Sequence, residues 1–83
     1  MADGLGVLEQ ARRELDLSFP DLWMRYFTLG GMSTEMEVEA ILFGFLVGTV
    51  HDRDVLAVAL NERFAELGRD HPVPYAGDEG PQP

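Results

Sequence analysis

Residues 34–48 read TEMEVEAILFGFLVG and form the most apolar run of the chain. On a helix with 3.6 residues per turn, one face of this run carries Val38, Ile41, Leu42 and Phe45. The roughly opposite face carries a second apolar set: Met36, Ala40, Phe43 and Val47. Because a helix that is apolar on two faces must be covered on both, the run predicts the central helix of a small bundle.

Two helices are predicted before this run. The first is amphipathic and repeats Leu5, Leu8, Ala11 and Leu15 at helical spacing, with Glu9 on its polar side. Ser18 and Pro20 mark the start of the second helix, which extends to about Leu29 and stops at Gly30-Gly31. Its apolar arc, which we expect in the core, contains Phe19, Leu22, Trp23, Tyr26, Phe27 and Leu29.

The central helix and the last helix both begin with a recognisable cap. Thr34 and Glu37 form a capping box for the central helix, and Thr49 is the N-cap of a helix over Val50–Leu67. The sequence therefore predicts an all-α bundle of about four helices within residues 1–68. Residues 69–83 are rich in Pro and Gly and predict a flexible tail, although Val73-Pro74-Tyr75 is a candidate strap that folds back.

Charge and composition exclude several classes of function. The chain has 83 residues, a formal net charge of −9, no lysine and no cysteine. A strongly acidic surface disfavours nucleic acid and anionic membranes, so we expect neither as a partner. The apolar run is too short to span a bilayer, and no basic and apolar leader opens the chain, which favours a cytoplasmic location. The acidity suits a basic protein partner, or simply keeps a small domain soluble.

The polar clusters all have structural explanations, so we expect no catalytic residue, cofactor or metal. His51 beside Asp52 and Asp54 lies at a predicted helix start, where acidic residues are favoured without any ligand. The pairs Glu35/Glu39 and Glu62/Glu66 share helix faces but lack the partners that general acid–base chemistry needs. The aromatic arc of the second helix is interpreted as core before it is interpreted as a ligand pocket.

The second apolar face of the central helix is the candidate interaction surface. It comprises Met36, Ala40, Phe43, Gly44 and Val47. Ala40, Gly44 and Gly48 fall four residues apart and predict an edge along which another helix approaches closely. Since a domain of this size has little stability margin alone, we expect a homodimer. The alternative is that this face lies inside the monomer.

Two stretches resemble known proteins. Leu22–Gly31, which reads LWMRYFTLGG, and Val55–Phe64, which reads VLAVALNERF, are similar to segments of small acidic actinobacterial proteins of unassigned function. Glu9-Gln10-Ala11-Arg12 followed by Leu17-Ser18 resembles part of the helical ANTAR module of response regulators. The first resemblance implies a fold over about Leu5–Gly68 and no catalytic residue; the second implies a regulatory role.

The function expected from these observations is a non-catalytic protein–protein interaction or regulatory module that self-associates. Two alternatives remain open. A divergent ANTAR-like module is one. The other is an acyl-carrier-like or small-molecule-binding helical domain, because Ser18 stands at a helix start where carrier proteins attach their prosthetic arm, although the Asp-Ser-Leu sequence of that family is absent.

Overall fold

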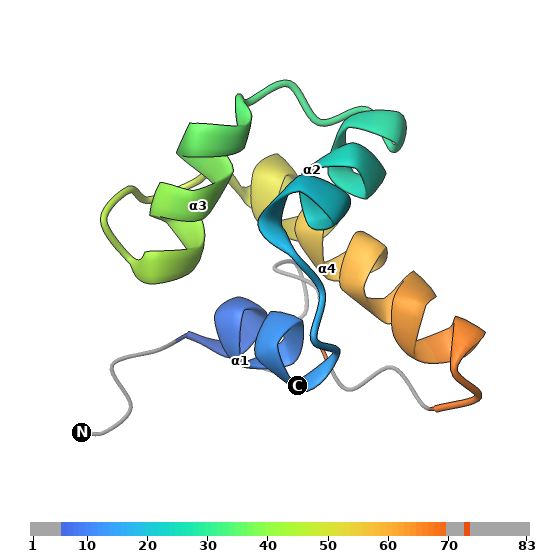
Figure 1. Cartoon of the computed structure of the whole chain (residues 1–83). Helices are drawn as coiled ribbons and strands as arrows, with labels where there is room; N and C mark the ends of the chain where they lie inside the picture. Colours follow the sequence, from blue (N-terminus) through green and yellow to red (C-terminus); the bar gives the residue numbers. More distant parts are fainter. Residues whose placement is uncertain (1–5, 70–72, 74–83) are drawn as a thin grey trace, which may run out of the picture.

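The computed structural model describes residues 6–69 and residue 73. Within this part of the chain the helices are α1 (Val7–Glu14), α2 (Phe19–Thr28), α3 (Glu35–Phe43) and α4 (Val50–Glu66), and there is no strand. They pack into a single all-α bundle (Figure 1). The predicted fold class is confirmed.

The longest helix, α4, is the centre of the bundle. Both α1 and α2 pack against it, and α3 packs against α1 and α2 (Figure 1). Buried residues are spread around much of the circumference of α4: Val55, Leu56, Ala57, Ala59, Leu60, Asn61 and Phe64. The prediction that residues 34–48 supply the central helix is therefore wrong, because α3 buries only the face of Val38, Ile41 and Leu42.

The predicted starts of α2, α3 and α4 are confirmed by side-chain caps, whereas α1 starts after Gly6 without one. The N–H groups of Asp21, Glu37 and Asp52 donate to the hydroxyl oxygens of Ser18, Thr34 and Thr49, respectively. The Glu37 carboxylate accepts the Thr34 N–H at 2.8 Å, so the predicted capping box of α3 is complete. Asp52 closes the same box at the start of α4. These bonds satisfy backbone donors that a helix start leaves without intrahelical partners.

All four helices of the described chain end in the same Schellman turn, in which one residue adopts the left-handed conformation. The left-handed residues are Asp16 (φ 53°), Gly30 (φ 102°), Gly44 (φ 83°) and Gly68 (φ 77°). In each turn the next residue donates its N–H to a carbonyl five positions back, as Phe45 does to Ala40 at 2.8 Å. The turn at Gly44 ends α3 at Phe43, five residues before the predicted end.

This early end corrects two predictions about residues 44–48. Phe45 does not continue the buried face of Val38 and Leu42, and its side chain is 84% exposed. Ala40, Gly44 and Gly48 do not line one helix edge, because the last two lie beyond the helix. At Gly48 the close approach comes instead from the side chain of Ile41 in the same chain, whose Cδ1 atom would lie 2.9 Å from an added Cβ atom.

Two other predicted orientations differ from the structure. Glu9, predicted on the polar side of the first helix, is completely buried. Phe27 and Leu29, predicted in the core arc of α2, are 55% and 37% exposed, while Leu22 and Tyr26 of the same arc have no exposed surface. Leu5 of the predicted first stripe lies outside the described residues.

The chain returns to the bundle after α4. Val73 is 2% exposed and belongs to the main hydrophobic cluster. Its backbone N–H and C=O are both bonded to the side chain of Asn61 on α4. The predicted tail therefore contributes one core residue, as the strap alternative requires; Pro74 and Tyr75 lie outside the described residues.

Candidate interaction surface

The outward side of α3 and the segment after it expose an apolar surface, which we name the α3 surface. It consists of the predicted residues Met36, Ala40, Phe43, Gly44 and Val47, together with Phe45. Met36 is 80% exposed, Phe45 84% and Val47 89%, whereas Ala40 and Phe43 are half-buried. Apolar surface concentrated in this way on a small domain is typical of a protein contact site.

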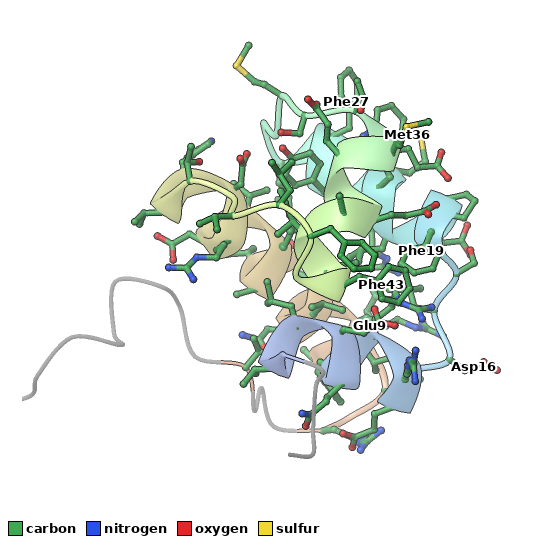
Figure 2. All side chains as sticks on the ribbon, turned by 90° about the vertical axis from the view of Figure 1, so that its left-hand side faces the viewer. Glu9, Asp16, Phe19, Phe27, Met36 and Phe43 are labelled. Atoms are coloured by element: carbon green, nitrogen blue, oxygen red, sulfur yellow. The ribbon has the colours of Figure 1, made fainter. Side chains whose placement is uncertain are left out.

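Aromatic rings make the α3 surface continuous with α2. The ring of Phe43 lies 5.5 Å from that of Phe19 and 6.2 Å from that of Phe45, measured between centroids. Figure 2 faces this side of the molecule, with Phe19 and Phe43 side by side and Met36 further along α3. The exposed Phe45 ring therefore packs on the half-buried Phe43 ring, which packs in turn on the half-buried Phe19 ring of α2.

A buried ion-pair cluster supports Phe19 from the α1 side. The Arg12 guanidinium lies 3.9 Å from the centroid of the Phe19 ring, a cation–π contact. Arg12 also donates to both carboxylate oxygens of Glu9, at 2.8 and 2.6 Å, and to the Leu17 carbonyl at 2.8 Å. Arg13 adds a third bond to Glu9, at 2.8 Å. This cluster fixes the turn between α1 and α2 and is complete without a ligand.

The pKa of Glu9 reflects the same contacts. Burial alone would raise the pKa of this carboxyl group, because it disfavours the charged form. The hydrogen bonds and charges of Arg12 and Arg13 outweigh burial and hold the pKa below its ordinary value. Glu9 is therefore ionised at neutral pH and acts as a structural anion, not as a proton donor or acceptor for chemistry.

The segment that forms the α3 surface carries acidic residues and no arginine or lysine, whereas Arg12 of α1 contacts the neighbouring Phe19 ring. Between Arg25 and Arg53 the chain contains Glu35, Glu37, Glu39 and Asp52 as charged residues, with His51 alone capable of a positive charge. Glu37 is exposed, and Glu35 and Glu39 are half-buried. A partner of this surface must therefore provide apolar contact and tolerate, or neutralise, carboxylates.

A second polar network lies at the loop between α2 and α3. The hydroxyl group of buried Tyr26 donates to Asp52 at 2.9 Å and accepts the N–H groups of Met32 and Ser33. Burial would raise the pKa of Asp52, but the bonds from Tyr26 and Thr49 hold it below its ordinary value. Each polar group in this network has a partner inside the protein, so the network fixes the loop to α4 and offers no open ligand position.

The remaining sequence candidates stay apart or have structural roles. Ser18 uses its exposed hydroxyl group as the α2 cap. Glu66 binds Arg25 at 2.8 Å and Arg63 at 3.0 Å, and these contacts lower its pKa to about 2. Among the described residues no three His, Cys, Asp or Glu side chains lie close enough together to hold a metal ion.

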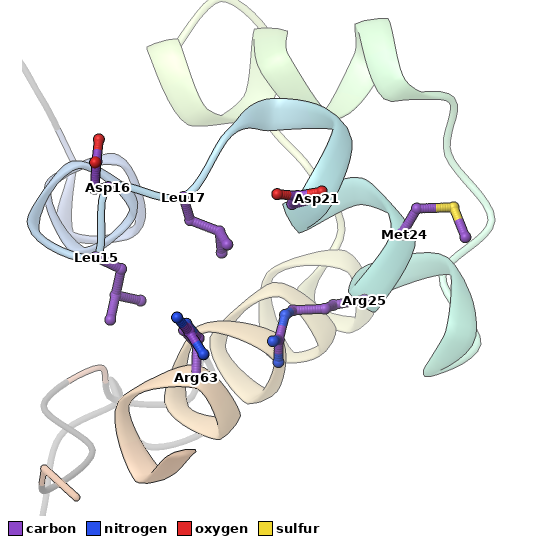
Figure 3. A pocket seen from close by; sticks show the side chains of 7 residues that line it. All are labelled: Leu15, Asp16, Leu17, Asp21, Met24, Arg25 and Arg63. Carbon is purple, nitrogen blue, oxygen red and sulfur yellow. The ribbon is translucent and has the colours of Figure 1, made fainter. Parts of the chain in front are cut away.

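An open groove of about 520 Å³ lies between the α1–α2 turn, α2 and α4 and bears on the small-molecule alternative (Figure 3). It is lined by Leu15, Asp16, Leu17, Asp21, Met24, Arg25 and Arg63. Both arginines are already paired with Glu66, and the groove is open to solvent. It lacks the apolar enclosure and converging polar groups that characterise a ligand pocket.

No protein family, curated protein or solved structure matches the chain. The resemblances to small actinobacterial proteins and to the ANTAR module therefore stay predictions. Within residues 6–69, no helix combines the length and the apolar composition that crossing a bilayer requires.

Proposed function

We propose that this protein is a non-catalytic, cytoplasmic interaction module that binds other protein chains, and in particular a second copy of itself, through the α3 surface. The observation that carries the proposal is the position of Phe45. At two of the other helix ends, the residue that follows the left-handed position is buried, as Leu17 and Gly31 are; at the third, Arg69 lies over the Phe64 ring. Phe45 is the exception, with its large apolar side chain in solvent.

Exposing Phe45, Val47 and Met36 together opposes the hydrophobic effect, which favours covering each of them by about 1.5–3 kcal/mol. The buried face of α3 is formed by Val38, Ile41 and Leu42, and within residues 6–69 Met36, Phe45 and Val47 stay exposed. A second copy supplies an identical apolar surface, and two such surfaces related by a twofold axis cover each other.

A basic protein partner is the second candidate. It is favoured by the acidic residues Glu35, Glu37 and Glu39 beside the α3 surface and by the absence of arginine and lysine from residues 26–52. In a homodimer these carboxylates approach their own copies and repel, whereas a basic partner neutralises them. Added salt should therefore strengthen the binding of a second copy and weaken the binding of a basic partner.

Sedimentation equilibrium of the full chain at low and high salt tests the proposal. We expect a mass close to twice 9.2 kDa and tighter self-association as salt screens the carboxylates. A chain that stays monomeric under all conditions, but binds a cationic amphipathic helical peptide more weakly as salt increases, supports the basic partner instead. A monomer that shows neither behaviour contradicts the proposed function.

A further inference from the structure

The methionines of the described chain all lie on its surface. Met24 is 54% exposed, Met32 89% and Met36 80%. Methionine is ordinarily one of the more buried residue types, because its side chain is apolar and flexible enough to fill gaps in a core. Here the buried apolar cluster of the described residues consists of leucine, isoleucine, valine, alanine, tyrosine and phenylalanine. Sulfur is therefore placed where solvent and a partner reach it, and is absent from this cluster.

A methionine side chain loses its apolar character when it is oxidised. Hydrogen peroxide transfers one oxygen atom to the thioether sulfur: the sulfur supplies the electron pair of the new S–O bond, the O–O bond breaks, and water leaves. The sulfoxide that forms is polar, so an apolar contact disfavours it. Because the chain has no cysteine, the methionine thioethers are the only sulfur atoms that this reaction can reach.

Met36 is the methionine that belongs to the α3 surface. It lies in the first turn of α3, and the capping box of Thr34 and Glu37 fixes the start of that helix. Met32 lies in the loop before α3, and Met24 lines the groove on α2, so neither is part of the α3 surface. Oxidation at Met36 therefore places a polar oxygen on the α3 surface, whereas oxidation at Met32 or Met24 leaves this surface unchanged.

We propose that Met36 is a redox-sensitive modification site that regulates self-association through the α3 surface. The inference rests on the proposed function, because it requires a second copy on that surface. Peroxide oxidises Met36 in the monomer, where the side chain is exposed, and the sulfoxide then lowers the affinity between two copies. Conversely, a second copy covers Met36 and slows its oxidation.

Sedimentation equilibrium of the full chain before and after peroxide treatment tests the regulation, with mass spectrometry to verify the sulfoxide at Met36. We expect oxidation to raise the dissociation constant of the dimer by about tenfold or more. Circular dichroism should show the helices retained, because the buried cluster contains no methionine. Met36→Leu keeps an apolar side chain of similar size and should stay dimeric in peroxide. Met32→Leu, the matched control, should dissociate as the original chain does.

The possible failures are distinguishable. An untreated chain that is monomeric contradicts the proposed function, and the regulation with it. A dimer that oxidation at Met36 leaves intact contradicts the regulation alone. The same holds if Met36→Leu dissociates in peroxide as far as the original chain, or if the oxidised chain loses its helices.

The oxidation rate at each methionine tests the proposal without any variant. Peptide mass spectrometry follows sulfoxide formation at Met36 and Met32 in the unmodified chain, at about 1 µM and about 100 µM protein and the same excess of peroxide. We expect Met36 to react several-fold more slowly at the higher concentration, where a second copy covers it, and Met32 to react equally fast at both. Equal rates for Met36 at the two concentrations, in a chain that dimerises between them, overturn the proposal.

Discussion

Gly31 lies flat against the ring of Tyr26, so that a Cβ atom at position 31 would come within 2.3 Å of the ring. The ring has nowhere to move, because Tyr26 is fully buried and its hydroxyl group is fixed by Asp52, Met32 and Ser33. Glycine at position 31 is therefore required by packing and not by a left-handed backbone.

The first prediction follows from this contact. Gly31→Ala should destabilise the fold by about 1–3 kcal/mol, the usual result of forcing an extra carbon into a filled core. Denaturant unfolding of the two chains measures the difference. Met32→Ala, which changes the adjacent and 89% exposed side chain, is the control and should have little effect. A Gly31→Ala chain as stable as the original would show that the Tyr26 ring is not fixed in this way.

The Schellman turns predict effects of opposite sign at two positions. Asp16 is left-handed at the end of α1, where the other helices have glycine, so Asp16→Gly should stabilise the protein by about 0.5–1 kcal/mol. Gly44→Ala should destabilise by about 1 kcal/mol, although no atom lies within 4 Å of the added carbon, because alanine tolerates φ 83° poorly. Thermal unfolding measures both changes.

The Gly44→Ala variant also separates two explanations for glycine at this position. If Gly44 lay on a helix edge packed against another chain, the added methyl group would weaken self-association. The observed turn instead predicts that the added methyl group lowers the stability of each chain. If sedimentation shows that Gly44→Ala dissociates the assembly without lowering the melting temperature, the turn is not the reason for this glycine.

The Glu9 cluster predicts a pH dependence. Because the folded-state pKa of Glu9 lies below its ordinary value of 4.5, its contribution to stability is fully present above that value. The contribution is lost as the pH falls through the lower, folded-state pKa. Glu9→Gln should therefore cost about 1–3 kcal/mol at neutral pH, and its deficit relative to the original chain should shrink near pH 3.

Urea unfolding at the two pH values measures this deficit. Glu62→Gln, at an exposed carboxylate, is the control and should show no comparable deficit at either pH. A deficit for Glu9→Gln that is the same at neutral and acid pH would mean that the ionised carboxylate is not the stabilising species.

Local signals in the sequence predicted the helix starts and most helix ends well. The caps Ser18, Thr34 and Thr49 act within three residues, so their hydrogen bonds follow from the sequence once a helix is assumed. The end of α3 was mispredicted because the apolar residues after Gly44 continue the helical pattern. Gly44 followed by the apolar Phe45 also fits a Schellman end, and this competing local signal decides the structure.

Glu9 and Val73 show where pattern analysis fails for physical reasons. Pattern analysis places a charged residue on the solvent side of a helix by default. Glu9 is buried nevertheless, because Arg12 and Arg13, three and four residues later in the sequence, neutralise its charge. Val73 packs because of Asn61, twelve residues earlier, and no local pattern encodes that contact. The predicted α3 surface needed one addition, Phe45, whose exposure depends on where the helix ends.

The most direct test of the central claim, that the α3 surface binds a second copy, is the mass of the full chain in solution and in two matched variants. Phe45→Ser removes the 84% exposed ring of the α3 surface, and Met24→Ser removes an apolar, 54% exposed side chain in the groove on α2. At about 100 µM we expect the original chain and Met24→Ser to sediment near twice 9.2 kDa and Phe45→Ser near 9.2 kDa. An original chain that is monomeric at this concentration, or a dimer that Phe45→Ser leaves intact, would contradict the account.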